Sequence, residues 1–323
     1  MTKPKVIVTR KWPDAVEASL KELYDVQLNA SDVPMTAAEL KTALQSADAL
    51  LTTVTDPISA DILSVPGKRC KIIGNFGVGY NNIDIEAAKR EGIVVTNTPH
   101  VLTDCTADIA MLLLLMTARR GSEGDRLVRN NQWTGWGPTH LLGQKVTGKT
   151  LGLIGFGRIA QATARKAHFG FGMKIICYAP RAPLPVILRE FDATYYPTVD
   201  EVLKQADFIS LHCPGGAATK HLINEERLKL MKPTAHLINT ARGDVVDSKA
   251  LIEALKEHRI AGAGLDVFEG EPTIDPSFCE LDNVALLPHL GSATLETRVA
   301  MGNRVMTNIA AFFAGQEPGD RVV

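Results

Sequence analysis

Short runs of Val, Ile and Leu that end in small or polar residues recur along the first hundred residues. They read KVIVTR at 5–10, ADALLTT at 47–53, KIIGNF at 71–76 and IVVTNT at 93–98. Continuous apolar runs of this length are typical of strands buried on both faces of a sheet. Helical patterns lie between them, and one opens with Thr36 and Glu39 at the spacing of a capping box. The alternation predicts βαβ units and a parallel sheet.

A second series of such runs follows a helix expected over 103–120 and a connection rich in Gly and Trp, NNQWTGWGPTHLLG. The runs are TLGLIGFG at 150–157, MKIICY at 173–178, DFISLH at 207–212, AHLINTAR at 235–242, AGLDVF at 263–268 and VALLPH at 284–289. A last helical pattern covers 295–314. The fold class predicted is α/β, with two doubly wound parallel-sheet domains.

Composition narrows the function classes. The 323 residues are 45% hydrophobic and 22% charged with a net charge of -1, so no basic excess favours nucleic acid or an anionic membrane. The longest apolar stretch, Ile109 to Met116, is far shorter than the roughly 18 residues of a membrane span. Five scattered cysteines and no signal-peptide pattern indicate a reducing compartment. We expect a cytoplasmic protein that acts on a small molecule.

A glycine motif follows the strand TLGLI directly and opens a helix. Gly155 permits a tight turn, Gly157 lets the backbone approach a pyrophosphate, and Ala160 allows close packing of helix on strand. Arg158 and Ile159 begin the helix, whose N-terminal N–H groups favour anions. This context predicts dinucleotide binding, and the alternative is a tight structural turn.

The next strand suggests which dinucleotide. An NAD site usually places an Asp or Glu on the ribose about 20 residues beyond the glycines. Here MKIICY is followed by Ala179, Pro180 and Arg181, and the next carboxylate is Glu190. Because a guanidinium binds phosphate and no acid repels it, we expect NADP(H). The alternative is that Arg181 only solvates a loop.

Three further segments carry a family resemblance. INTARGDVVD contains Arg242, LDVFEGEP contains Asp266 and Glu271, and LLPHLGSAT contains His289. With GFGRIA and NFGVGYNNID, in this order, they resemble the D-isomer-specific 2-hydroxyacid dehydrogenases over nearly the whole chain. NFGVGYNNID, KAHFGFGM and QWTGW are most similar to the glyoxylate/hydroxypyruvate reductases of that family. The resemblance implies reduction of a small 2-oxo acid to a 2-hydroxy acid.

The chemistry of three residues agrees with that reaction. Reduction of a 2-oxo acid needs a cation for the carboxylate and carbonyl, a proton donor, and a group that keeps the donor protonated. Arg242, His289 and Glu271 supply one of each. A free imidazole titrates near about 6.5, and an adjacent carboxylate favours the imidazolium. Singly, each residue also fits a structural role: an ion pair, a packed ring or a turn.

Other cofactor contacts follow from the resemblance. Thr240 and Ala241 end one strand of the second series and Asp266 ends the next, where the family contacts the nicotinamide. Asp266 can equally cap a turn. Cys213 and Pro214 follow the strand DFISLH and either border the cofactor or pack beneath it.

The substrate and the quaternary structure involve further segments. The N–H groups of Val78 and Gly79 are candidates for a substrate carboxylate, unless this is an ordinary glycine turn. The resemblance implies a homodimer in which Trp136 reaches the substrate pocket of the other subunit. The alternative has Trp133 and Trp136 packed within their own subunit.

The domain layout and the competing functions complete the expectations. We expect a flavodoxin-like substrate domain of residues 1–100 and 292–323, with a Rossmann NADP-binding domain of residues 101–291 inserted into it. No histidine spacing suggests a catalytic metal. A nucleotide-sensing scaffold like the corepressors that resemble this family is the alternative of another class. A 3-phosphoglycerate-type dehydrogenase is the alternative among enzymes.

Overall fold

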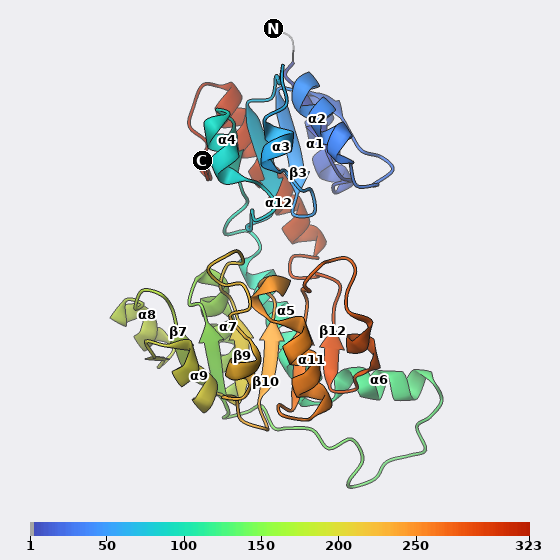
Figure 1. Cartoon of the computed structure of the whole chain (residues 1–323), viewed down its shortest axis with the longest axis vertical. Coiled ribbons are helices and arrows are strands. Elements are labelled where there is room, and N and C mark those ends of the chain that lie inside the picture. Colours follow the sequence, from blue (N-terminus) through green and yellow to red (C-terminus); the bar gives the residue numbers. More distant parts are fainter. Residues whose placement is uncertain (1–2) are drawn as a thin grey trace. The chain divides into compact units, whose positions relative to one another are not determined.

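The computed structural model describes residues 3–323, and the chain divides into two compact units (Figure 1). The split unit comprises the residues up to Leu102 together with Ser292–Val323, and the inserted unit is Thr103–Gly291. The domain boundaries that we expected from the sequence follow residues 100 and 291.

The split unit contains a five-stranded parallel sheet in the order β2-β1-β3-β4-β5. Its strands are β1 (Lys5–Val8), β2 (Asp25–Gln27), β3 (Ala49–Thr53), β4 (Ile72–Phe76) and β5 (Val94–Thr96). This is the flavodoxin-like order, so the predicted doubly wound fold is confirmed. The sequence pattern missed β2, because an edge strand of three partly exposed residues carries no apolar run.

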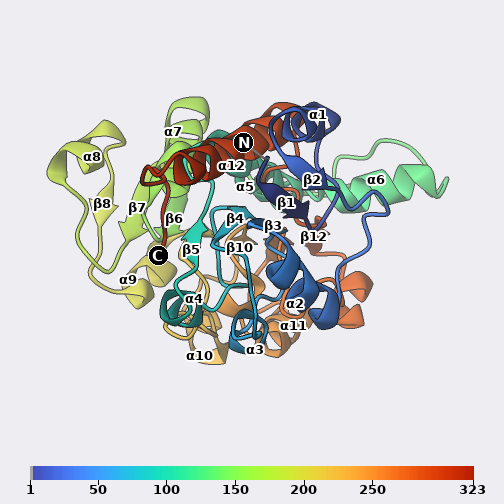
Figure 2. The ribbon, with the colours of Figure 1, turned by 90° about the horizontal axis from the view of Figure 1, so that it is seen from above.

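Helices cover this sheet, and the last of them comes from the end of the chain. They are α1 (Asp14–Leu23), α2 (Ala37–Ser46), α3 (Ala60–Leu63), α4 (Ile85–Arg90) and α12 (Leu295–Phe313). Helix α12 packs on β4 and lies beside α1 (Figure 2). Two glycines permit this approach, because a Cβ on Gly74 would lie 2.5 Å from Val305 and one on Gly302 2.6 Å from Val16.

The start of α2 confirms the capping box. The hydroxyl of Thr36 accepts the N–H of Glu39 at 3.3 Å, and the Glu39 carboxylate accepts the N–H of Thr36 at 2.7 Å. Two N–H groups that the helix leaves unpaired are thereby satisfied.

The inserted unit contains a seven-stranded parallel sheet in the order β12-β11-β10-β9-β6-β7-β8. Its strands are β6 (Thr150–Ile154), β7 (Lys174–Tyr178), β8 (Thr194–Tyr195), β9 (Phe208–Leu211), β10 (His236–Asn239), β11 (Gly262–Leu265) and β12 (Val284–Leu286). Numbered within the unit, the order begins 3-2-1-4-5-6, which is that of a Rossmann fold. Its switch point lies between β6 and β9, where the direction of winding reverses.

Helices lie on both faces of this sheet. They are α5 (Thr103–Ala118), α6 (Gly121–Arg129), α7 (Arg158–Phe171), α8 (Pro185–Glu190), α9 (Val199–Gln205), α10 (Glu225–Leu228) and α11 (Ser248–Lys256), with short 3₁₀ turns at Gly243–Val245 and Pro276–Glu280. Successive side chains of a strand point to opposite faces of the sheet and therefore pack into different hydrophobic cores. Leu151 and Leu153 pack with α5 and α7, whereas Ile154 packs with α9 and α11.

The connection between the helical and sheet parts of the inserted unit differs from the expectation. One helix was expected over 103–120, but α5 ends at Ala118 and a second helix, α6, follows. Arg120 has a left-handed backbone with φ of 52°, which interrupts the helix. Residues 130–149 then contain no helix or strand.

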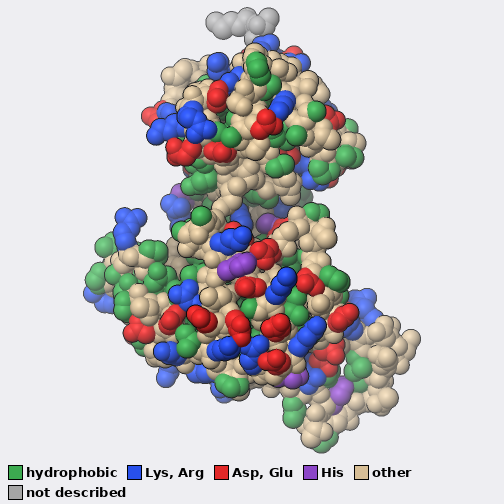
Figure 3. Space-filling model, viewed as in Figure 1, with side chains coloured by type: hydrophobic (Ala, Val, Ile, Leu, Met, Phe, Trp, Pro, Cys, Tyr) green, Lys and Arg blue, Asp and Glu red, His purple; other side chains and the backbone are tan. Residues whose placement is uncertain are grey.

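The described surface shows mixed charge and no helix suited to a membrane. Within residues 3–323, no helix combines the length and the apolar character needed to cross a bilayer. On the face in view, acidic and basic side chains are interspersed over the inserted unit (Figure 3). This mixture agrees with the net charge of -1.

Candidate active site

Three of the predicted residues follow three neighbouring strands. Arg242 follows β10, Asp266 follows β11 and His289 follows β12, and these strands are adjacent in the sheet. Because the carboxyl ends of parallel strands share one edge, the three residues belong to one region of the inserted unit. Glu271 joins them from the loop after β11.

His289 and Glu271 form a hydrogen-bonded pair. The Nδ1 atom of His289 lies 2.8 Å from Oε2 of Glu271, and the side chains are 36% and 30% exposed. The other carboxylate oxygen of Glu271 accepts the N–H of Phe268 at 2.8 Å. With Nδ1 occupied by the carboxylate, Nε2 of His289 is the nitrogen left to serve a ligand.

The carboxylate of Glu271 is held in its charged form. Burial alone would raise its pKa, but the hydrogen bonds from His289 and Phe268, and the charges of His289 and Arg242, outweigh burial. The pKa of Glu271 is therefore lowered from its ordinary value. This charged carboxylate holds Nδ1 of His289 and thereby orients the imidazole ring.

Asp266 anchors the loop that carries His289. Its carboxylate accepts the N–H groups of Leu290 at 2.6 Å and Gly291 at 2.8 Å, and its carbonyl accepts the N–H of His289 at 2.9 Å. Burial raises the pKa of this carboxyl, although these two N–H groups act in the opposite direction. His289 itself has a left-handed backbone with φ of 55°. Such a conformation persists where surrounding contacts impose it, and Asp266 supplies them.

Arg242 is fixed by the turn that follows β10. Asn239 accepts the N–H of Ala241 at 3.0 Å and donates to the carbonyl of Arg242 at 2.8 Å, which is an Asx turn. The guanidinium donates to the carbonyl of Ala241 at 2.6 Å. Burial lowers the pKa of Arg242, while the charges of Glu271 and Asp244 oppose this. Among residues 3–323 no carboxylate forms an ion pair with it, so this half-buried cation can bind an anionic ligand.

Two glycines allow the loops to pack tightly around Arg242. A Cβ on Gly243 would lie 1.9 Å from the carbonyl carbon of Phe268, so the chain after Arg242 touches the loop that leads to Glu271. A Cβ on Gly215 would lie 2.8 Å from the side chain of Arg242. No other residue type fits at position 243 without displacing the backbone.

The glycine loop lies at the switch point of the Rossmann sheet. Gly155 has φ of 89°, and a Cβ there would lie 2.8 Å from the carbonyl of His212 and 2.9 Å from the N atom of Cys213, just after β9. Gly157 faces open space and is the N-cap of α7, with no side chain capping the helix. These features suit a pyrophosphate, because the backbone is accessible and the helix N-terminus lacks an acceptor. Arg158 and Ile159 form the first turn of α7.

Two candidate cations for the cofactor, one after β7 and one at the start of α7, have no ion-pair partner among residues 3–323. Arg181 and Arg158 are exposed, and neither has an ion pair or side-chain hydrogen bond in the described part of the chain. Glu190, the nearest following carboxylate, forms an ion pair with Arg165 on α7. No acid is therefore left at this strand end to meet a ribose.

The remaining cofactor candidates also lie at strand ends. Burial raises the pKa of the Cys213 thiol to about 11, so it stays neutral and packs beside the core. Pro214 accepts a hydrogen bond from Thr219 at 2.6 Å through its carbonyl. The hydroxyl of Thr240 is buried and has no hydrogen-bond partner among residues 3–323, and Ala241 is 9% exposed. An unpaired buried hydroxyl is a place where a polar ligand group is expected.

Comparisons with known proteins agree with this geometry. Residues 111–291 match the family model described as D-isomer specific 2-hydroxyacid dehydrogenase, NAD binding domain. A glyoxylate reductase of Thermococcus onnurineus is 47% identical over 320 residues, which cover 98% of this chain and 95% of that protein. The chain belongs to the D-isomer specific 2-hydroxyacid dehydrogenases.

Solved structures support the same family and fold. A protein of Thermus thermophilus is 40% identical with a TM-score of 0.90, covering 99% of this chain and 100% of that chain. An NADPH-dependent glyoxylate/hydroxypyruvate reductase of Sinorhizobium meliloti, solved with NADP and malonate, is 34% identical with a TM-score of 0.88. The match covers 100% of this chain and 97% of that chain. The predicted family and the Rossmann fold of the dehydrogenase are thus confirmed.

The other predicted ligand residues belong to other segments of the chain. Val78 and Gly79 follow β4 of the split unit and are partly exposed. Trp136 lies in the connection of the inserted unit and is 85% exposed, and Trp133 is 56% exposed. Neither tryptophan is buried within its own chain as the structure describes it. Among the described residues, no group of three or more His, Cys, Asp and Glu could hold a metal.

Sequence reasoning missed residues that hold the loops around Arg242 and Glu271. Asn239 shapes the Arg242 turn, and an Asn directly after a strand is a recognisable signal for an Asx turn. His221 contacts Glu269 at 3.0 Å in the loop before Glu271, and no local pattern indicates this pair.

Proposed function

We propose that this dehydrogenase reduces glyoxylate and hydroxypyruvate to their 2-hydroxy acids with NADPH. The observation that carries the proposal is the His289–Glu271 pair, with Arg242 close enough for its charge to lower the pKa of Glu271. The relatives named glyoxylate reductase support glyoxylate, and the glyoxylate/hydroxypyruvate reductase of Sinorhizobium meliloti supports both substrates.

The residues divide the reaction between them. When bound, the reduced nicotinamide supplies a hydride to C2 of the 2-oxo acid. Arg242 binds the carboxylate and the carbonyl oxygen, where negative charge develops. His289, through Nε2, donates a proton to that oxygen, and Glu271 keeps the imidazole protonated and oriented. One hydride and one proton convert the ketone or aldehyde to an alcohol, which balances the reaction.

The cofactor would be held at the strand ends of the inserted unit. Gly155 and Gly157 leave room for the pyrophosphate, and the open N-terminus of α7 favours its charge. Thr240 would meet the nicotinamide with its unpaired hydroxyl, beside Ala241. Asp266 would lie at the nicotinamide side of the cofactor and would act by holding the His289 loop. Cys213 and Pro214 would border the cofactor at the end of β9.

Preference for NADPH rests on the unpaired cations. Arg181 and Arg158 would bind the adenosine 2'-phosphate, and no acid follows β7 to select a free ribose hydroxyl. The Sinorhizobium meliloti relative is described as NADPH-dependent, which favours the same choice.

Substrate binding and assembly are the remaining parts. Val78 and Gly79 would bind the substrate carboxylate through their N–H groups. We further propose a cytoplasmic homodimer in which Trp136 approaches the partner's substrate. The exposure of Trp136 supports this, because a large aromatic side chain gains most from burial in an interface.

A kinetic panel tests the proposal. The purified protein is assayed with glyoxylate, hydroxypyruvate, pyruvate and a bulkier 2-oxo acid, each with NADPH and with NADH. Glyoxylate and hydroxypyruvate with NADPH should give the highest kcat/KM. No turnover with any 2-oxo acid would reject the function, and equal use of both cofactors would reject the NADPH assignment alone.

A further inference from the structure

The loop after β4 of the split unit is held by its carbonyl oxygens. The side-chain amide of Asn97 donates to the carbonyl of Val78 at 2.8 Å, and that of Asn75 donates to the carbonyl of Gly79 at 2.9 Å. Two consecutive peptide groups are therefore bound by side chains through their oxygen atoms. The N–H groups of Val78 and Gly79 have no acceptor among residues 3–323.

The preceding residue extends this arrangement. The carbonyl of Gly77 accepts the N–H of Thr98 at 3.0 Å. A Cβ on Gly77 would lie 2.4 Å from Val54, so the loop is also in close contact with the segment after β3. Three successive carbonyls thus accept hydrogen bonds from the split unit's own residues.

Asn75 can take only one amide orientation here. It is fully buried, and its side-chain oxygen accepts the hydroxyl of Thr52 at 3.3 Å. The NH₂ group must then face the loop, where it reaches the carbonyls of Gly79 at 2.9 Å and Gly77 at 3.4 Å. A side chain fixed in this way costs no further ordering when a ligand binds.

Asn97 is fixed through the C-terminal segment. Its N–H donates to the carbonyl of Asp320 at 3.2 Å, and its carbonyl accepts the amide of Asn308 on α12 at 3.4 Å. Asp320 is held by Arg304 through two hydrogen bonds of 2.6 and 2.7 Å. The residue that holds the Val78 carbonyl is thus tied to α12.

We infer that Asn75 and Asn97 are positioning residues that fix the Val78–Gly79 loop with its N–H groups free for the substrate carboxylate. This rests on the proposed function, which assigns those N–H groups to the carboxylate. Free N–H groups on successive residues bind anions, and a fixed loop presents them without an entropic cost at binding. Neither asparagine touches the substrate, and each acts through the backbone.

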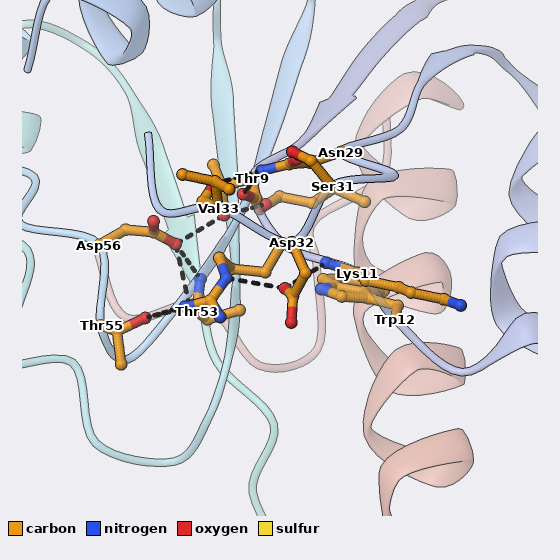
Figure 4. A network of polar contacts seen from close by, with 12 residues as sticks. Thr9, Lys11, Trp12, Asn29, Ser31, Asp32, Val33, Thr53, Thr55 and Asp56 are labelled. Atoms are coloured by element: carbon orange, nitrogen blue, oxygen red, sulfur yellow. Dashed lines mark hydrogen bonds and ion pairs between the residues drawn. The ribbon is translucent and has the colours of Figure 1, made fainter. Parts of the chain in front are cut away.

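Asn97→Ala is the principal test, because Asn97 is only partly buried and its loss should not prevent folding. Asn75→Ala is the second variant. Asn29→Ala is the matched control, because the amide of Asn29 donates to the carbonyls of Thr9 and Val33, both at 2.7 Å, in another loop of the same unit (Figure 4). For each variant we would measure KM and kcat for glyoxylate, the NADPH dissociation constant and the melting midpoint.

Asn97→Ala and Asn75→Ala should raise the KM for glyoxylate about fivefold, the effect of losing one hydrogen bond, with kcat and the NADPH constant unchanged. Asn29→Ala should lower the melting midpoint and leave that KM unchanged. The inference is overturned if Asn97→Ala keeps the wild-type KM, or if Asn29→Ala raises KM equally. A wild-type protein that reduces no 2-oxo acid overturns the proposed function and the inference together.

Discussion

At the scale of single residues, the contact between His289 and Glu271 has the clearest consequence for catalysis. His289→Ala should lower the turnover of glyoxylate roughly 100 to 10,000-fold, because a positioned general acid contributes that much. NADPH binding, measured by fluorescence titration, should change little. His258→Ala is the matched control, since His258 also has a left-handed backbone, with φ of 53°, but is exposed outside the cluster. Normal turnover by His289→Ala would remove the proton-donor assignment.

Glu271→Gln should change the pH dependence and preserve the site. We expect the acidic limb of the activity profile to move, because the pKa of the Glu271 carboxyl is lowered in the wild type and the neutral Gln cannot titrate. The Gln side-chain oxygen can still accept the N–H of Phe268. A kcat/KM profile that coincides with the wild type would contradict the tuning role.

The same carboxylate links folding stability to pH. Because folding lowers the pKa of Glu271, its stabilising contribution is present above the unfolded value of about 4.3 and is lost as the pH falls through the folded value. The melting-midpoint difference between wild type and Glu271→Gln should therefore shrink as the pH is lowered below about 4.3. A difference that stays constant over this range would contradict the linkage.

Arg181→Ala should weaken NADPH selectively. Loss of a charged hydrogen bond to phosphate costs on the order of 1.5 to 3 kcal/mol, so the apparent constant for NADPH should rise at least about tenfold, with that for NADH nearly unchanged. Arg189→Ala is the control, as another exposed arginine of the same region, on α8. If Arg181→Ala raised the apparent constants for NADPH and NADH equally, Arg181 would not bind the 2'-phosphate.

At the scale of elements, the contact between the turn after β10 and the loop after β11 decides whether the site forms. Gly243→Ala should lower both the melting midpoint and activity, because its Cβ would lie 1.9 Å from the backbone of Phe268. Gly170→Ala on α7 meets nothing within 4 Å and should stabilise the protein by roughly 0.5–1 kcal/mol through helix propensity. Calorimetry compares the two. A Gly243→Ala variant that melts and reacts like wild type would show that this contact is dispensable.

At the scale of the whole molecule, the exposed tryptophans predict self-association. Sedimentation at micromolar concentration should show a dimer, because Trp136 at 85% exposure leaves a large apolar surface in water. Trp136→Ala should change the ratio of kcat/KM between glyoxylate and hydroxypyruvate more than it changes NADPH affinity. A monomer under these conditions would refute the proposed role of Trp136 in a partner's site.

Local signals were enough to predict most of the fold. The runs of Val, Ile and Leu, the glycine motif and the capping box depend on residues near one another in the chain. Most strands, the helices that begin after Thr36 and Gly157, and the doubly wound class therefore followed from the sequence. The edge strands β2 and β8 were missed because they are short and partly polar, and the break at Arg120 depends on a single left-handed residue.

Arg242, Glu271 and His289 were chosen as candidates from the family resemblance and from their chemistry, and each follows a strand or lies in the loop after one. Only the tertiary structure decided their geometry. The 2.8 Å contact of His289 with Glu271, the anchoring of its loop by Asp266, and the carbonyl bonds of Asn75 and Asn97 join segments distant in sequence. Such contacts depend on strand order and loop packing, which no local pattern encodes.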